Sequence, residues 1–364
     1  MQEACQLLQA AFAGGNDVAA KNSPLIVPNP DIRTAIAIPL RNEVDRLPRL
    51  LSALARQVDA PPFLCCLFLD NCDDGSGELI ARLAPKLPFP IVTECCFAGL
   101  APNAGAARRR AMALALTHVA DGTVMTTDAD SQPAADWIAT NLAALRRADI
   151  VAGRVVQAGP ATSLLQDRVI TYLDRLHALR RTLDPVPWES VETHHWTSGA
   201  SLALTVDVYR QLGGFLELIH GEDAQLADAA SRKGYRVRRD ARVTVTTSSR
   251  RKGRVPHGFA ATLAAYDADP DKPQVAHPAD EAWRFALQAQ ARAAFGSREA
   301  EQALAGPLGL PQREIAEVSS ECRNGEAFAS RIVGAPAGGM RIVSLAHAEA
   351  VLTGLGQVDL VGVA

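Results

Sequence analysis

Residues 123–138 have the sequence TVMTTDADSQPAADWI, in which an apolar run gives way to two carboxylates, a proline and a helical pattern. The β-branched run predicts a strand over residues 123–127. Apolar side chains then recur at helical spacing and predict a helix; they are Trp137, Ile138, Leu142 and Leu145. A strand, a polar turn and a helix in succession form the repeating unit of a mostly parallel sheet.

The same alternation extends in both directions, from about residue 34 to about residue 247. Further strands are expected at residues 34–38, 63–69, 91–96, 150–156, 201–205 and 237–247. The sequence therefore predicts an α/β protein with a doubly wound, mostly parallel sheet flanked by helices, followed by a mainly helical C-terminal extension. In such folds ligands bind at the carboxyl ends of the strands.

The chain of 364 residues is long enough for one large domain with an appendage. Its net charge of −3 gives no overall attraction to nucleic acid, so no nucleic-acid partner is expected. The seven cysteines lack paired zinc-type spacing and are expected to be buried thiols in a reducing compartment. No apolar stretch approaches the ~18 residues of a spanning helix, and the N-terminal sequence does not resemble a signal peptide. We therefore expect no transmembrane segment and a cytoplasmic location.

Asp128 and Asp130 stand one residue apart, directly after the expected strand. Because side chains alternate along a strand, both carboxylates point to the same side and could bind one cation. Mg²⁺ and Mn²⁺ prefer such oxygen ligands, often together with phosphate oxygens. The alternative is a pair of capping residues before a helix that has Pro133 in its first turn.

A second acid pair, Glu222 and Asp223, begins another helical pattern. Asp223 shares a helical face with Leu226 and Ala230, so it is expected to point toward the protein or a cleft. The positive end of the helix dipole favours an ionised carboxylate, as a general base requires. The alternative is an acid that only stabilises the first turn of the helix.

A basic loop, SSRRKGR at residues 248–254, follows the last expected strand. The guanidinium groups of Arg250 and Arg251 could clamp a diphosphate, with a solvated surface as the alternative. His257 could be a third ligand for the cation, or a surface residue. His195 and Trp196 suit contacts with a sugar, although a partly buried core position would also explain the tryptophan. No loop fits the P-loop or the Rossmann dinucleotide pattern.

Taken in order, six segments resemble the nucleotide-sugar-dependent glycosyltransferases of family 2, which have the GT-A fold. The segments are IPLRNE (38–43), LDNCDDGSGE (69–78), AGAARRRAMALA (104–115), TTDADSQPAADWI (126–138), SGASLALTVDVYRQLGGF (198–215) and GEDAQLADAASRKGYRV (221–237). The resemblance spans about residues 34–255, and the order of the segments is more specific than any single motif. It favours the catalytic alternative for both acid pairs.

Together with the basic loop and the loop around Trp196, the resemblance implies a set of site residues. Contacts with the donor nucleotide are expected from Pro39, Leu40, Asn42, Glu43, Asp70, Arg108, Asp128, Ala129, Arg250 and Arg251. The metal ion, Mn²⁺ or Mg²⁺, is expected at Asp130 and Asp128, with His257 as a further ligand. Asp223 is expected to be the catalytic base, with Glu222 beside it as an acceptor contact or a structural residue. Contacts with the acceptor are expected from His195, Trp196, Ser198 and Gly199.

The sequence thus predicts a metal-dependent enzyme that moves a sugar from a UDP- or GDP-type nucleotide sugar to an unidentified hydroxyl acceptor, with inversion by direct displacement. A sugar nucleotidyltransferase is the alternative with a related fold, although PLRNEVDR at residues 39–46 lacks its Gly-rich, Lys-containing loop. A non-catalytic nucleotide- or glycan-binding protein is the alternative from another class.

Three parts are expected along the chain. They are an N-terminal helical segment at residues 1–30, a GT-A glycosyltransferase domain at 31–268 and a C-terminal extension of unknown role at 269–364. An acceptor-side insertion is expected at residues 159–196, because the sequence there interrupts the alternation of strands and helices. A homo-oligomer remains an open alternative.

Overall fold

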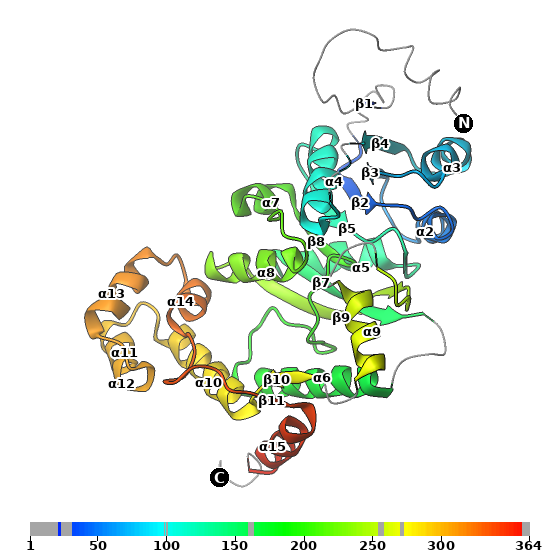
Figure 1. The fold of residues 1–364 in the computed structure, drawn as a ribbon. Coiled ribbons are helices and arrows are strands. Elements are labelled where there is room, and N and C mark those ends of the chain that lie inside the picture. Colours follow the sequence, from blue (N-terminus) through cyan, green and yellow to red (C-terminus); the bar gives the residue numbers. More distant parts are fainter. Residues whose placement is uncertain are drawn as a thin grey trace.

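A computed structural model of the protein describes residues 21–22, 31–97, 99, 101–158, 164–253, 258–269 and 273–358. At its centre is a nine-stranded sheet with the order β1-β4-β3-β2-β5-β8-β7-β9-β6. Helices cover both faces of this sheet (Figure 1). The strands are β1 (Lys21–Asn22), β2 (Thr34–Leu40), β3 (Phe63–Asp70), β4 (Ile91–Cys96), β5 (Thr123–Thr126), β6 (Ser131–Pro133), β7 (Ile150–Gln157), β8 (Leu202–Thr205) and β9 (Val237–Thr247). The expected fold class, a mostly parallel sheet flanked by helices, is confirmed.

The direction of the strands decides which loops meet at one edge of the sheet. β2 pairs in parallel with β3 and β5, β3 pairs in parallel with β4, and β7 pairs in parallel with β9. β8 runs antiparallel to both β5 and β7. The residues before β8 therefore lie at the same edge as the residues after β2, β3 and β5, which brings Ser198 and Gly199 to the edge where ligands bind.

Two hydrophobic clusters, one on each face, hold helices on the sheet. The first packs α4 (Ala104–His118), α7 (Val206–Leu212) and α8 (Glu222–Arg232) on one face, through residues such as Met112, Val208 and Leu226. The second packs α2 (Leu47–Ala55), α3 (Ser76–Leu83) and α5 (Trp137–Leu145) on the other, through Leu50, Ile80 and Trp137. A short 3₁₀ turn, η1 (Ala84–Lys86), follows α3.

β2 extends beyond the expected end at residue 38 and contains Pro39. β2 pairs with β3 as far as Leu40, but its pairing with β5 ends at Ala37. At Pro39 the strand therefore has a neighbour on one side only, where a residue without an N–H is tolerated.

The turn after β5 differs from the expectation of a helix with Pro133 in its first turn. Residues Ser131–Pro133 form β6, which pairs antiparallel with the end of β9, and α5 begins only at Trp137. Asp128 and Asp130 are thus in a tight turn between two strands, in which the Ser131 N–H donates to the Asp128 carbonyl at 3.0 Å. Their role as helix caps is excluded by this geometry.

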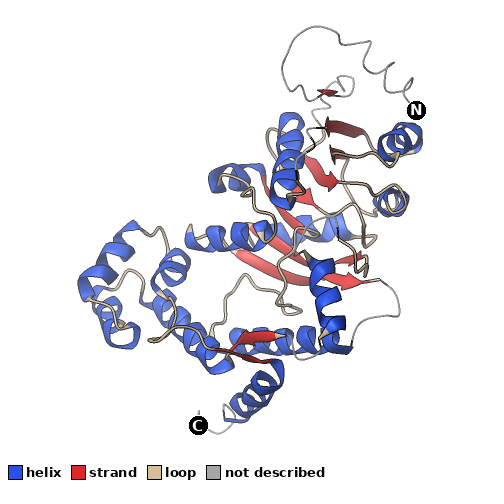
Figure 2. Cartoon of the chain, in the orientation of Figure 1, coloured by secondary structure: helices blue, strands red, loops and turns tan. Residues whose placement is uncertain are grey.

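The C-terminal part is mainly helical, as expected (Figure 2). Its elements are α9 (Phe259–Ala268), β10 (Gln274–Ala276), α10 (Pro278–Ala294), α11 (Arg298–Ala303), α12 (Ala305–Leu308), α13 (Gln312–Glu321), α14 (Gly325–Ile332), β11 (Ile342–Ser344) and α15 (Leu345–Val358). The helix α6 (Leu164–Leu183) joins it to the sheet: its residues share one apolar cluster with Phe285 of α10 and Leu352 of α15, and its Asp174 pairs with Arg154 of β7. The Asn324 side chain also donates to the Gly234 carbonyl, at 2.9 Å.

The expectations for the N-terminal segment, the division of the chain and the cysteines can be compared with the structure. The helical segment expected at residues 1–30 lies outside the described residues, apart from β1, and the expected division of the chain into three parts remains a prediction. Cys65 and Cys66 are buried as expected, whereas Cys72, Cys95, Cys96 and Cys322 are only partly buried. Among the described residues, no helix is both long and apolar enough to cross a membrane.

Candidate active site

A cavity of about 290 Å³ opens at the carboxyl ends of β2, β3 and β5. Most of the residues singled out from the sequence line it. They are Pro39, Leu40, Glu43, Asp70, Arg108, Asp128, Ala129, Asp130, Trp196, Ser198, Gly199, Glu222, Asp223 and Arg250. The two acid pairs, which are about 95 positions apart in the sequence, therefore face one space.

Three of the expected residues do not line this cavity. Asn42 exchanges hydrogen bonds with Asp73, from its Nδ2 at 2.7 Å and to its Oδ1 at 3.0 Å, and so ties two loops together. Arg251 pairs with Asp267 of α9 at 2.6 Å, and His195 bonds through Nδ1 to Asp174 of α6 at 2.7 Å. His257 lies outside the described residues.

Arg108 on α4 connects the two acid pairs. Its Nε donates to Glu222 Oε1 and its Nη2 to Asp128 Oδ1, both at 2.9 Å. Its Nη1 donates to Thr126 Oγ1 at 3.0 Å and to the Gly199 carbonyl at 2.9 Å. Burial alone would lower the pKa of Arg108, but Asp128 and Glu222 outweigh it and raise the pKa, so the guanidinium stays charged.

Gly199 leaves the space that this guanidinium occupies. A Cβ atom at position 199 would lie 2.3 Å from Arg108 Cζ, which is far inside van der Waals contact. Because Arg108 is buried and four of its five N–H donors bond to these partners, it positions the acids rather than reaching into open solvent.

Asp223 stands in the first turn of α8, as expected, and its neighbour Glu222 is buried beneath it. The Gly199 N–H donates to Asp223 Oδ2 at 2.7 Å and fixes the carboxylate against the loop before β8. The positive end of the α8 dipole favours the ionised form of Asp223. The two acids differ in environment, since only Asp223 is partly exposed and able to meet a substrate.

Asp130 is held by β6 and β9. Ser131 pairs with Thr247 across the two strands, and Thr247 Oγ1 lies 3.5 Å from Asp130 Oδ1. Arg250 reaches Asp130 Oδ2 at 3.2 Å and also pairs with Glu43. Burial, followed by the charge of Asp128, raises the pKa of Asp130 to about 6, against the opposing effect of Arg250.

The donor set in this turn fits a hard divalent cation, because Asp128 and Asp130 offer carboxylate oxygens to one cavity. Two protein carboxylates together with phosphate oxygens are the usual surroundings of Mg²⁺ in nucleotide sites. Within the described ranges, no three His, Cys, Asp or Glu residues cluster tightly enough to hold a metal by themselves. A cation here would thus depend on oxygens from another source, such as a bound phosphate.

Two parts of the cavity wall were not anticipated from the sequence. Arg41 donates to Asp70 Oδ2 at 3.2 Å, although it stands inside the IPLRNE segment. The loop that carries Ile219 and His220 also lines the cavity, and it is pinned to the start of α4 because the Gly105 N–H donates to the Leu218 carbonyl at 2.9 Å. No periodic pattern marks that loop, so only the fold could reveal it.

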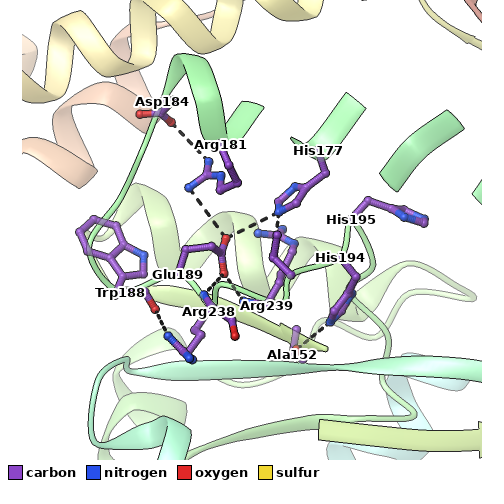
Figure 3. A network of polar contacts seen from close by, with 12 residues as sticks. Ala152, His177, Arg181, Asp184, Trp188, Glu189, His194, His195, Arg238 and Arg239 are labelled. Carbon is purple, nitrogen blue, oxygen red and sulfur yellow. Dashed lines mark hydrogen bonds and ion pairs between the residues drawn. The ribbon is translucent and has the colours of Figure 1, made fainter. Parts of the chain in front are cut away.

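The loop between α6 and β8 carries Trp196 and is held by buried polar contacts (Figure 3). Glu189 accepts the Arg239 backbone N–H at 2.7 Å and lies 3.7 Å from His177 Nε2 and 3.8 Å from Arg181 Nη1. Burial, followed by the arginine charges around it, lowers the pKa of His177 to about 2. His177 is therefore neutral at physiological pH.

His194 is also a neutral structural histidine. The Trp196 N–H donates to its Nδ1 at 3.1 Å, so Nε2 carries the proton and donates to the Ala152 carbonyl, also at 3.1 Å. Burial lowers the pKa of His194 to about 4. These bonds fix the backbone of Trp196, and with it the wall of the cavity.

Residues 35–191 match the family described as Glycosyl transferase family 2. This confirms the resemblance and the enzyme class expected from the sequence. The matched range includes Asp128, Asp130 and Arg108, whereas Asp223 lies beyond it.

The chain is also similar to solved structures of glycosyltransferases. One is S. aureus TarS 1–349 in complex with UDP-GlcNAc, with 13% identity, 82% of this chain and 90% of that chain covered and a TM-score of 0.47. Another is the mannosyltransferase PcManGT from Pyrobaculum calidifontis in complex with GDP-Man and Mn²⁺, with 19% identity, 88% and 87% coverage and a TM-score of 0.45. A comparison with curated protein sequences finds no match.

Proposed function

We propose that this glycosyltransferase moves a hexose from a UDP- or GDP-type nucleotide sugar to a hydroxyl acceptor, with inversion and with Mn²⁺ or Mg²⁺ as cofactor. One observation carries the proposal: Arg108 joins Asp128 of the first acid pair to Glu222 of the second across a single cavity. A donor held at one acid pair would then have its reacting carbon facing the other.

The proposed binding of the nucleotide-sugar donor is supported by the charged side chains at one end of the cavity. Asp128 and Asp130 would hold the divalent cation, which neutralises charge on the diphosphate leaving group when bound. Arg250 lines the same part of the cavity and is the cation of this chain best placed to assist the leaving group. Asp70, held by Arg41, is suited to accept hydrogen bonds from the nucleotide base.

The proposed activation of the acceptor hydroxyl depends on Asp223. Its carboxylate is held by the Gly199 N–H, so it is oriented for a fixed acceptor position. We assign it the removal of the proton from the attacking hydroxyl, as an inverting displacement requires. Trp196 and Ser198 line the adjoining wall and suit contacts with a polar, ring-shaped acceptor.

Calorimetric titration with a panel of UDP- and GDP-sugars, with and without Mn²⁺, tests the donor side. Mn²⁺ should strengthen donor binding to the wild type, and Asp130→Asn should weaken the metal-dependent binding by at least about tenfold. Asp121→Asn is the matched control, because Asp121 is exposed and pairs with Arg33 at 2.5 Å, away from the residues that line the cavity.

Three outcomes separate the alternatives. Tight donor binding without sugar transfer to any acceptor would favour a non-catalytic binding protein. Formation of a nucleotide sugar from a nucleoside triphosphate and a sugar phosphate would favour a nucleotidyltransferase. Absence of binding to every nucleotide sugar would contradict the proposal.

A further inference from the structure

Four arginines of α6, β9 and α10 lie near one another, since the pKa of Arg180 is affected by the charges of the other three. They are Arg180 and Arg181 of α6, Arg239 of β9 and Arg284 of α10. The Nε atom of each is buried and has no hydrogen-bond partner among the described residues. Buried charged donors are normally paired, so four such atoms in one place are exceptional.

The nearby carboxylates are already engaged by other groups. Asp184 and Glu326 both pair with Arg292, Glu281 pairs with Arg284, and Glu189 accepts the Arg239 backbone N–H. Arg181 keeps two longer contacts, to Asp184 at 3.6 Å and to Glu189 at 3.8 Å. The acids of this region therefore do not compensate all of its cations.

Arg180 and Arg239 are the least compensated. In the described part of the chain, the Arg180 guanidinium has no ion pair within 4.0 Å and lies against the Phe285 ring, with its Cζ 5.4 Å from the ring centroid. The Arg239 guanidinium donates one hydrogen bond there, to Thr197 Oγ1 at 3.3 Å. Burial, followed by the charges of Arg239 and Arg181, lowers the pKa of Arg180 to about 9.

Both residues nevertheless remain partly exposed. Each residue is therefore neither fully buried nor fully exposed, although its Nε atom is buried. In the described part of the chain, neither guanidinium forms an ion pair with a carboxylate within 4.0 Å, and planar guanidinium forks match the oxygens of phosphate.

We propose that Arg180 and Arg239, assisted by Arg284, bind a phosphate group. Thr197 links this position to the cavity, because it bonds Arg239 and stands between Trp196 and Ser198, which line the cavity wall. The phosphate group can come from two sources: a free phosphate ion, or a phosphate carried by the acceptor. That the phosphate belongs to an acceptor rests on the proposed function, whereas the binding of phosphate by these arginines does not.

A thermal-unfolding titration with inorganic phosphate at constant ionic strength tests the site. Phosphate should raise the midpoint of the wild type saturably, and Arg180→Met or Arg239→Met should weaken the apparent affinity by at least about tenfold. Arg313→Met is the control for loss of one positive charge, since the Arg313 side chain is 88% exposed on α13. Equal phosphate responses in all three variants, or none in the wild type, would overturn the proposal.

The variants are expected to fold. Removing a buried cation that lacks a partner relieves a cost, so without phosphate Arg180→Met should unfold at the same or a higher temperature than the wild type. If Arg180→Met instead unfolds, Arg239→Met provides the second measurement of phosphate affinity.

A comparison of hexose 6-phosphate, hexose and inorganic phosphate separates the two sources. If the phosphate belongs to the acceptor, hexose 6-phosphate should bind more tightly than inorganic phosphate, and Arg180→Met should abolish this difference. If the ligand is a free anion, both phosphates should bind alike and both should depend on Arg180. A failure of sugar transfer leaves these binding results unchanged, so the two proposals fail separately.

Discussion

Arg108 connects the acid pair at Asp128 with the acid pair at Glu222 and so holds the two walls of the cavity together. It is buried and contacts Thr126, Asp128, Gly199 and Glu222 through three different nitrogen atoms. The resemblance implied Arg108 as a nucleotide contact, but the AGAARRR segment contains three consecutive arginines and does not itself show which one points inward. Only the packing of α4 on the sheet decides that Arg108 is buried while Arg109 and Arg110 are not.

Removing Arg108 should destabilise the fold through Glu222. Arg108→Met leaves a buried carboxylate without its partner, which typically costs about 3–5 kcal/mol of unfolding free energy. The double variant Arg108→Met with Glu222→Gln should recover part of this loss. Urea unfolding of the two single variants and the double variant measures the coupling, and strictly additive losses would contradict it.

Gly199→Ala tests whether the position of Arg108 matters for catalysis. The added Cβ would displace the guanidinium from Asp128 and Glu222. We expect sugar transfer to fall by at least about tenfold, because small misplacements of catalytic groups are costly. Gly306→Ala is the control, since nothing lies within 4 Å of a Cβ added there. Unchanged transfer by Gly199→Ala would show that Arg108 has freedom to move.

At the scale of elements, the sequence located the main strands well but not the short ones. β-branched and apolar runs predicted β3, β4 and β5 within one residue. β6 has three residues, one of them proline, and carries no strand pattern. Its pairing with β9 is a tertiary effect, and it is this pairing that holds Asp130 beside Thr247.

The loop between α6 and β8 should make stability depend on pH. His177 and His194 have folded-state pKa values lowered to about 2 and about 4. In the unfolded chain each takes up a proton near its ordinary value of about 6.5, so unfolding binds protons and the folded state loses stability as pH falls below that value. The loss approaches about 1.4 kcal/mol per pH unit for each histidine.

Urea unfolding at neutral and mildly acidic pH measures this dependence. His177→Gln removes one titrating group while keeping a hydrogen-bonding side chain near Thr193, and below pH 6 it should lower the slope of unfolding free energy against pH by about 1.4 kcal/mol per pH unit. His347→Gln, at an exposed position, should leave it unchanged. An identical slope in His177→Gln and the wild type would contradict the account of a buried neutral histidine.

On the scale of the whole molecule, the C-terminal helices and the sheet share contacts that tie them into one body. Leu165 and Tyr172 of α6 pack with Phe285 of α10 and Leu352 of α15, and Asn324 reaches Gly234 beyond α8. The sequence predicted helices here but not their partners, because apolar residues at helical spacing do not specify which surface they cover. The same docking brings Arg180 and Arg181 of α6 near Arg239 of β9 and Arg284 of α10.

Phe328→Ala tests whether these parts unfold together. Phe328 of α14 is fully buried, so the change should cost about 3–5 kcal/mol through lost burial and a cavity. If the parts are one cooperative unit, the urea transition followed by circular dichroism should shift as a single step. Phe97→Ala, at a residue that is 73% exposed, should leave it in place. A second transition appearing only in Phe328→Ala would show that the C-terminal helices unfold separately.

The proposed glycosyl transfer depends most directly on Asp223, to which we assign the role of the base that deprotonates the acceptor. Release of nucleoside diphosphate from the preferred nucleotide sugar, in the presence of Mn²⁺ and an acceptor, should fall by about 10²–10⁴-fold in Asp223→Asn while donor affinity stays near that of the wild type. Asp228→Asn on the same helix, where the carboxylate is exposed and pairs with Arg232 at 2.7 Å, should turn over as the wild type does. Full turnover by Asp223→Asn, or an equal loss in both variants, would contradict the account.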